Sequence, residues 1–197
     1  MTATASPPIS AAPDVETTAA PSAKAPVVPA SARLPGGLLP NKDGKTFQVV
    51  SFRIGDEEYG VDIMAVQEII LVGVITQVPE VPEHVLGVIN LRGNVIPIMN
   101  LRRRFGMPDQ PVGETTRIVV MNLGGRTVGA VVDGVDEVLR LSTEEISATP
   151  ASLGGAGKDY VLGLARRKER LLILLDMARL LGGSDAGITT NHTGTEG

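Results

Sequence analysis

Only two histidines and no cysteine are available for acid–base, nucleophilic or metal-binding chemistry in this chain of 197 residues. His84 lies in a predicted solvent-exposed turn and His192 in a polar tail rich in Gly and Thr, and neither has the spacing of a catalytic triad or a zinc site. Neighbouring carboxylates at 56–58 and 144–145 are predicted to be solvated, because they lie in a turn and at a helix start. The sequence contains no phosphate-binding glycine loop. We therefore expect no enzymatic activity, no metal site and no cofactor.

Arginine side chains are better placed for another kind of chemistry, the recognition of a protein partner. Residues 87–94 lie between two apolar strands and put Arg92 at the tip of a Gly-flanked turn. Asn90 and Gly93 could simply complete that turn. Arginine, however, is over-represented among interface hot spots and offers a rigid fork of donors. Residues 66–69 allow the same two interpretations, a plain strand or the rim of a contact surface.

The run Arg102-Arg103-Arg104 also has two interpretations. A nucleic-acid patch would need more basic neighbours and aromatic rings for stacking. Aromatic residues make up only 3% of the chain, and its net charge is −4. We favour a short exposed helix whose basic last turn complements the helix dipole.

The elements that must position these residues begin with two predicted hairpins. Residues 47–54 and 59–63 are β-branched and aromatic runs joined by a Gly-containing turn. Residues 116–123 and 127–132 repeat the design around Gly124-Gly125. Short strands and frequent Gly turns favour small barrels or sandwiches over a parallel sheet.

The two hairpins belong to an internal duplication. Val50 aligns with Val119, 69 positions later, and the alignment continues without a gap to Glu68 and Glu137. Downstream, residues 85–106 match residues 161–182 at an offset of 76, and the extra positions are absorbed near 153–158. We therefore predict two related lobes of about five strands each, with an interwoven core as one possibility.

Each copy is predicted to close with a strand and a short helix. Asn100 and Asp176 are favoured N-cap residues, and Gly106 and Gly182 suit a left-handed C-cap. A capping box at 142–145 predicts one more short helix. Pro97, within a predicted strand, indicates an edge or a bulge.

Composition divides the chain into three parts. Residues 1–45 are dominated by Ala, Pro, Thr and Ser, and we expect a disordered tail there. Residues 46–182 form the predicted all-β domain, and residues 183–197 a flexible C-terminal tail. Lack of Cys fits a reducing compartment, and no stretch approaches the roughly 20 apolar residues of a membrane span. We expect a cytoplasmic protein without direct membrane insertion.

Five segments of the predicted domain carry a specific pattern: Gly55-Asp56-Glu57-Glu58-Tyr59-Gly60-Val61-Asp62-Ile63, Val66-Gln67-Glu68-Ile69, Val88-Ile89-Asn90-Leu91-Arg92-Gly93, Val131-Val132-Asp133-Gly134-Val135 and Leu172-Ile173-Leu174. In this order and register, from about Phe47 to Leu181, the chain resembles the CheW family of chemotaxis adaptors. Asn100 stands where many members carry Asp, and both residues cap helices. The long N-terminal tail is a larger departure.

The resemblance implies two SH3-like five-stranded β-barrels around a shared hydrophobic core. It implies partners too: the regulatory domain of a CheA-type histidine kinase, joined barrel to barrel, and the cytoplasmic signalling tip of a chemoreceptor, docked in the groove between the lobes. It further implies recruitment to membrane-associated receptor arrays, with no nucleic acid bound. Positions that the resemblance assigns to these contacts, with their turn neighbours, are Val66, Glu68, Gly87, Val88, Asn90 and Arg92.

Two other functions are alternatives to an adaptor. Small barrels can bind RNA or DNA, but the acidic balance and the scarcity of aromatics count against that. The chain could also be a small enzyme with an unrecognised site, but the lack of any His, Cys or carboxylate constellation in the sequence counts against that. The output pathway, swimming chemotaxis, surface motility or another, stays open.

Overall fold

The computed structural model describes Leu38 and residues 44–149, 159–167 and 170–182. Most of the predicted N-terminal tail, the predicted C-terminal tail with His192, and the loop expected near 153–158 lie outside these residues. In the described part of the chain, strands are short and helices are few. The elements are β1 (Thr46–Ile54), β2 (Glu57–Asp62), η2 (Ile63–Ala65), β3 (Val66–Leu71), β4 (Val85–Leu91), β5 (Asn94–Asn100), α1 (Leu101–Arg104), β6 (Arg117–Leu123), β7 (Arg126–Val132), β8 (Gly134–Ser142), η3 (Thr143–Glu145), β9 (Ile146–Ser147), β10 (Val161–Arg167), β11 (Arg170–Leu175) and α2 (Met177–Gly182).

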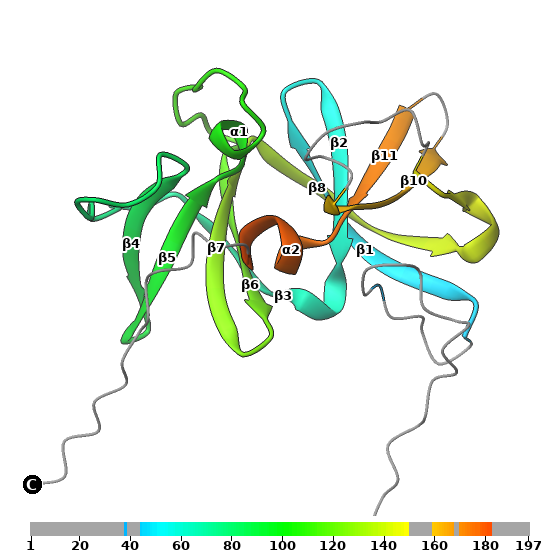
Figure 1. Cartoon of the computed structure of the whole chain (residues 1–197), viewed down its shortest axis with the longest axis horizontal. Helices are drawn as coiled ribbons and strands as arrows, with labels where there is room; N and C mark the ends of the chain where they lie inside the picture. The colour runs from blue at the N-terminus through cyan, green and yellow to red at the C-terminus, as the bar shows by residue number, and fades with distance from the viewer. Residues whose placement is uncertain (1–37, 39–43, 150–158, 168–169, 183–197) are drawn as a thin grey trace, which may run out of the picture.

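The strands form two barrels, and each barrel takes strands from both halves of the duplication (Figure 1). Barrel A has the strand order β8-β1-β2-β11-β10-β9, and barrel B has the order β3-β6-β7-β5-β4. The offset of 69 relates β1, β2 and β3 to β6, β7 and β8, and the offset of 76 relates β4 and β5 to β10 and β11. The two strand orders therefore correspond, apart from the short β9. The halves are interwoven, because β3, β4 and β5 share a barrel with the β6–β7 hairpin of the second copy, and β8, β10 and β11 share one with the β1–β2 hairpin of the first.

Both predicted hairpins are confirmed. β1 pairs antiparallel with β2, and β6 pairs in the same way with β7. β2 begins at Glu57, earlier than predicted, because only Gly55 and Asp56 are needed for the turn. Glu57 and Glu58 therefore lie in the strand rather than in the turn.

Three hydrophobic clusters follow from the alternation of apolar side chains along the strands. One fills barrel A and one fills barrel B. The third lies between the barrels and includes buried residues of α1 and α2 as well as of both sheets, and α2 lies between the two lobes in Figure 1. This shared core agrees with the expected architecture. Aliphatic side chains dominate it, and four of the five aromatic rings form one stack, with centroids 5.9, 5.2 and 5.9 Å apart along Phe52, Tyr59, Phe105 and Tyr160.

The predicted helix caps are largely confirmed. The side-chain oxygens of Asn100 and Asp176 accept hydrogen bonds from the third residue of α1 and of α2, at 3.2 and 2.9 Å. The capping box is present at η3, where the Ser142 N–H donates to Glu145 at 2.7 Å. Gly106 has the left-handed conformation, with φ of +70°, but Gly182 ends α2 without it.

Pro97 lies in β5, an inner strand of barrel B, rather than on an edge strand. The strand tolerates it because the parallel pairing of β5 with β7 covers only residues 98–100. At Pro97 itself the recorded pairing is with Val88 of β4 alone. The missing N–H therefore costs no bond of the β7 ladder.

Leu38 is an exception to the expectation that residues 1–45 form a disordered tail. Its side chain is 1% exposed and belongs to the core of barrel A, with Phe47, Leu139 and Leu141. We expect Leu38→Ala to lower the free energy of unfolding by about 2 kcal/mol, the loss typical of a large-to-small core substitution. Chemical denaturation would measure it against Leu171→Ala, since the Leu171 side chain is 45% exposed and its loss should cost under about 0.5 kcal/mol. Equal losses in the two variants would contradict the assignment of Leu38 to the core.

Candidate protein-interaction surface

A two-residue turn at the tip of the β4–β5 hairpin presents Arg92 to solvent. Arg92 and Gly93 have φ angles of +54° and +88°, which is the combination of a type I′ turn. The Asn90 side-chain oxygen accepts a hydrogen bond from the Gly93 N–H at 2.9 Å. Asn, Asp or Gly usually occupies the first position of such a turn, and positive φ is uncommon for other residues. Arginine at this strained position points to a role for its side chain.

Arg92 forms an ion pair with Glu68 across the open seam of barrel B. The Arg92 Nη2 donates to the Glu68 Oε2 at 2.9 Å, and the two side chains are 78% and 25% exposed. β3, which carries Glu68, and β4, which leads to Arg92, are the two terminal strands of the sheet. An exposed pair of this kind contributes roughly 0–1 kcal/mol to stability, so its exposed guanidinium remains available to a partner.

Gly87 and Val88 close the same barrel from within. The Val88 N–H donates to the Thr76 carbonyl at 2.8 Å, and the Thr76 N–H donates to the Val88 carbonyl at 2.9 Å. These bonds join the chain after β3 to β4. They bring the Thr76 carbonyl oxygen to 2.1 Å from where a Cβ on Gly87 would lie, and Gly87 has φ of +140°. Gly87 is buried. It therefore fixes the course of the backbone beneath the predicted contact surface and does not itself face a partner.

We expect Gly87→Ala to destabilise the protein by about 2 kcal/mol or more, because the added methyl meets backbone and the φ angle disfavours any side chain. Thermal unfolding would measure the change. Gly93→Ala is the control, since φ is also positive there but no atom lies within 4 Å of the new Cβ. A Gly87→Ala protein as stable as Gly93→Ala would show that the Thr76 segment yields freely.

Of the six predicted contact residues, three lie together at one end of barrel B: Glu68, Asn90 and Arg92. Val66 is half-buried and packs against the core between the barrels. Exposed apolar side chains are also present on β3 (Leu71, 68% exposed), on β5 (Val95, 52%) and in the segment between β3 and β4 (Val74, 92%). An exposed arginine together with exposed apolar side chains on the same barrel is suited to contact with protein.

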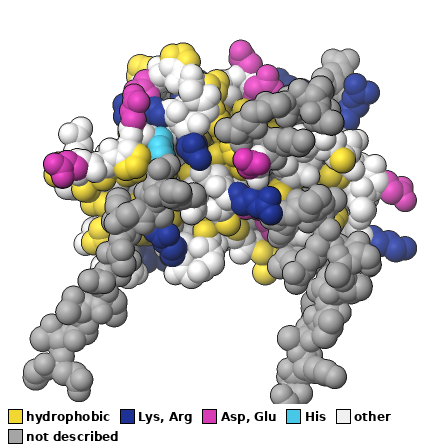
Figure 2. All heavy atoms as spheres, in the orientation of Figure 1, with side chains coloured by type: hydrophobic (Ala, Val, Ile, Leu, Met, Phe, Trp, Pro, Cys, Tyr) yellow, Lys and Arg dark blue, Asp and Glu magenta, His cyan; other side chains and the backbone are white. Residues whose placement is uncertain are grey.

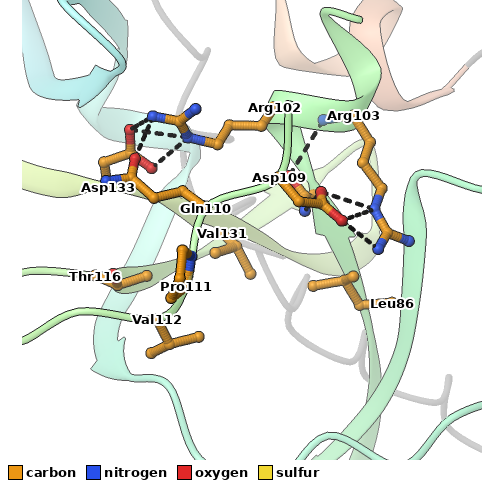
Figure 3. A pocket seen from close by; sticks show the side chains of 11 residues that line it. Leu86, Arg102, Arg103, Asp109, Gln110, Pro111, Val112, Thr116, Val131 and Asp133 are labelled. Atoms are coloured by element: carbon orange, nitrogen blue, oxygen red, sulfur yellow. Dashed lines mark hydrogen bonds and ion pairs between the residues drawn. The ribbon is translucent and has the colours of Figure 1, made fainter. Parts of the chain in front are cut away.

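The three arginines of α1 do not form the simple exposed helix face that we predicted. Each side chain is half-buried and bound to a different part of the molecule. Arg102 binds Asp133 through two nitrogens (Figure 3), and Arg103 binds Asp109 in the same way. The Arg104 Nε donates to the Leu180 carbonyl of α2 at 3.0 Å. The run therefore ties α1 to the crossing between the barrels, to the segment that follows α1 and to α2.

Asp133 is the centre of this network. The Arg102 Nη2 donates to the Asp133 Oδ2 at 2.8 Å, and the Gly55 N–H donates to the same oxygen at 2.7 Å. Asp133 follows β7 and precedes β8, where the chain crosses from barrel B to barrel A. Burial would raise the pKa of the Asp133 carboxyl, but hydrogen bonds from Arg102 and Gly55, together with nearby positive charge, outweigh it and hold the pKa below its ordinary value.

A hollow of about 190 Å³ lies beside these pairs (Figure 3). Its polar lining includes Asn100, Arg102, Arg103, Asp109 and Asp133. Each of these charged groups has an opposite charge as its partner. The hydrogen bond from Arg103 outweighs desolvation and lowers the pKa of Asp109. The hollow therefore offers no free acid, base or nucleophile.

The described residues were also searched for histidine chemistry, a metal site and a membrane span. His84 is half-buried in its turn, rather than fully exposed as predicted, and its carbonyl accepts from the Asn100 N–H at 2.7 Å. Among the described residues, no three His, Cys, Asp or Glu side chains are grouped to hold a metal. No helix in the described part of the chain has the length and apolar character to cross a membrane. On one face, acidic, basic and apolar side chains are interspersed (Figure 2).

The sequence interpretation missed the partners of the arginines. Asp133 lies 31 positions from Arg102, and only the folded chain joins them. Asp109, six positions after Arg103, was a detectable signal, because a carboxylate close behind a basic helix end can fold back onto it.

Comparisons with family models, curated proteins and solved structures all find similarity to the same family. The family model described as CheW-like domain matches residues 48–184. The chemotaxis protein CheW of Klebsiella aerogenes is 40% identical over 140 residues, which are 71% of this chain and 84% of the relative. Protein FrzA of Myxococcus xanthus is 32% identical over 133 residues, 66% of this chain and 82% of the relative. The crystal structure of the scaffolding protein TtCheW from Thermoanaerobacter tengcongensis matches with a TM-score of 0.61 and 32% identity, over 66% of this chain and 88% of that one.

Proposed function

The chain belongs to the CheW-like family, and we propose that it is a non-enzymatic adaptor that couples chemoreceptors to a CheA-type histidine kinase. One partner is the regulatory domain of the kinase, and the other is the cytoplasmic signalling tip of a receptor. The binding function resides in residues 46–182, the domain that the sequence predicts between its two tails. The protein acts in the cytoplasm, at membrane-associated receptor arrays.

The exposed Arg92–Glu68 pair is the observation that best supports this function. Arg92 lies at the tip of a hairpin in a strained backbone conformation. The ion pair between Arg92 and Glu68 is exposed and contributes little to the free energy of unfolding. Val66, Glu68, Gly87, Val88, Asn90 and Arg92 are therefore proposed as the contact region. Glu68, Asn90 and Arg92 contribute polar groups, and Gly87 fixes the backbone beneath them.

The proposed mechanism is binding alone. A receptor signal reaches the kinase only if the contacts through the adaptor differ in free energy between the active and inactive kinase states. Two barrels with a shared core suit this task, because a displacement of one barrel reaches the other through the packed side chains between them.

Calorimetric titration tests the proposal. The full chain would be titrated with the regulatory region of the CheA-type kinase of the same organism and, separately, with a receptor signalling tip. Binding to both, with dissociation constants on the order of micromolar, is expected. Failure to bind either fragment would leave a member of the family without the proposed partners.

A further inference from the structure

From β1 to β11 the chain passes between the two barrels twice, at equivalent positions of the duplication. The first crossing connects β2 to β3 through η2, and the second connects β7 to β8 through Asp133. The offset of 69 aligns Asp133 with Met64 of the first copy. The Met64 side chain is uncharged and 76% exposed. The two crossings are therefore related by the repeat, but only the second has a carboxylate at this position.

Every polar group of Asp133 forms a hydrogen bond. On the side of barrel A, its N–H donates to the Arg53 carbonyl of β1 at 3.0 Å, and its Oδ2 accepts from the Gly55 N–H at 2.7 Å. On the side of barrel B, its carbonyl accepts from the Thr115 Oγ1 at 2.8 Å, and both carboxylate oxygens accept from Arg102. Thr115 precedes β6, and Arg102 lies in α1, which follows β5. One residue thus joins two segments on the side of each barrel.

The shared core between the barrels consists of apolar side chains. Such packing opposes separation of the barrels, but the hydrophobic effect is non-directional, and packed elements can slide by small amounts. Hydrogen bonds depend on direction as well as on distance, and a carboxylate held by an arginine through two nitrogens adds geometric specificity. The bonds of Asp133 are therefore suited to fix the angle between the barrels, which apolar packing alone does not define.

We propose that Asp133 is a pivot that fixes the angle between the two barrels. While its bonds are intact, the barrels move as one body, and when the bonds are broken, the barrels turn relative to each other on the shared core. The inference deepens the proposed adaptor function and rests on it for its meaning in signalling, because Asp133 determines how a displacement of one barrel reaches the other. Asp133 is in this sense a positioning residue.

A distance measurement between spin labels in the full chain tests the pivot. The chain has no Cys, so Val138→Cys on β8 of barrel A and Val95→Cys on β5 of barrel B provide two specific labelling sites, and each valine is 52% exposed. In this labelled protein, Asp133→Asn should shift or broaden the distribution of label distances by about 1–2 Å, the scale on which packed elements shift.

Two control variants separate the pivot from a general loss of stability. Asp136→Asn removes a carboxylate that binds Arg53 at 3.0 Å, but this pair joins β8 to β1 within barrel A. Leu38→Ala weakens the core of barrel A without removing a bond of the crossing. Both variants should keep the wild-type distribution of label distances. If Leu38→Ala changes the distribution as much as Asp133→Asn does, the change only follows lost stability and the inference is wrong.

A wild-type distribution in Asp133→Asn would also overturn the inference, because the shared core alone would then fix the angle. If Asp133→Asn does not fold, Thr115→Val takes its place, since it removes only the hydrogen bond to the Asp133 carbonyl, and the same two outcomes decide. The measurement needs neither proposed partner. Its failure therefore leaves the adaptor function standing, and a wild type that binds neither fragment in the calorimetric titration leaves the pivot standing as a property of the fold.

Discussion

Replacing Asp133 with alanine is expected to lower the free energy of unfolding by about 3 kcal/mol, because removal of one partner of a desolvated pair leaves the other uncompensated. The Arg102 side chain is only 14% exposed, so water cannot fully replace the carboxylate. The Gly55 N–H loses its acceptor at the same time. Since Asp133 joins α1 and the β1–β2 turn at the crossing between the barrels, we expect cooperative unfolding at lower denaturant concentration.

Asp136→Ala is the matched control for Asp133→Ala. Asp136 also binds an arginine, Arg53, at 3.0 Å, but these side chains are 33% and 40% exposed. Its loss should therefore cost less than about 1 kcal/mol. Similar losses in the two variants would show that the position of Asp133 between the barrels adds nothing to an ordinary surface pair.

Asp133 also predicts part of the acid sensitivity of the protein. Its pKa in the folded state is lowered, so the stabilisation is fully present above the unfolded pKa of about 3.9 and is lost as the pH falls through the folded value. The stability difference between wild type and Asp133→Asn should thus be constant above about pH 5 and shrink below about pH 4. Comparison with this variant is needed, because Asp109 and Glu145 also have lowered pKa values. A difference that grows on acidification would contradict the assignment.

The strands and their duplication could be predicted from the sequence because they depend on local patterns. Alternating apolar residues, Gly turns and capping side chains repeat at fixed offsets in both copies. The exchange of the β1–β2 and β6–β7 hairpins between the barrels could not be derived from the repeat, because equivalent strands satisfy equivalent ladders in either arrangement. Which pairing prevails is decided by the connections and by the shared core, neither of which is visible in a local pattern.

At the candidate site, the sequence could not predict most of the ion-pair partners, because these partners lie far apart along the chain. Arg92 was identified from its turn, and Glu68 from the resemblance, but their ion pair spans 24 positions. The α1 arginines were misjudged as exposed for the same reason. Leu38 was missed because Leu34, Leu38 and Leu39 stand among Pro, Gly and Ala and belong to no strand or helix period that would mark burial.

Arg92→Glu is expected to weaken binding to the kinase fragment or the receptor tip by about 30- to 100-fold, as for the loss of an interface hot spot. Reversal removes an exposed guanidinium and puts a second carboxylate beside Glu68. The fold should survive, because the Arg92 side chain is 78% exposed and the pair contributes at most about 1 kcal/mol. Calorimetric titration measures the affinity, and a denaturation curve on the same sample checks the fold.

The double variant Glu68→Arg with Arg92→Glu decides how Arg92 acts. It restores an ion pair across the seam of barrel B while reversing both charges. If the pair served only to hold the hairpin, the double variant would bind like wild type. We expect it to bind as weakly as Arg92→Glu, because a partner that meets the guanidinium at the hairpin tip would meet a carboxylate instead. Recovery of binding would therefore move Arg92 from the contact surface to its support, and loss of cooperative unfolding in Arg92→Glu would do the same.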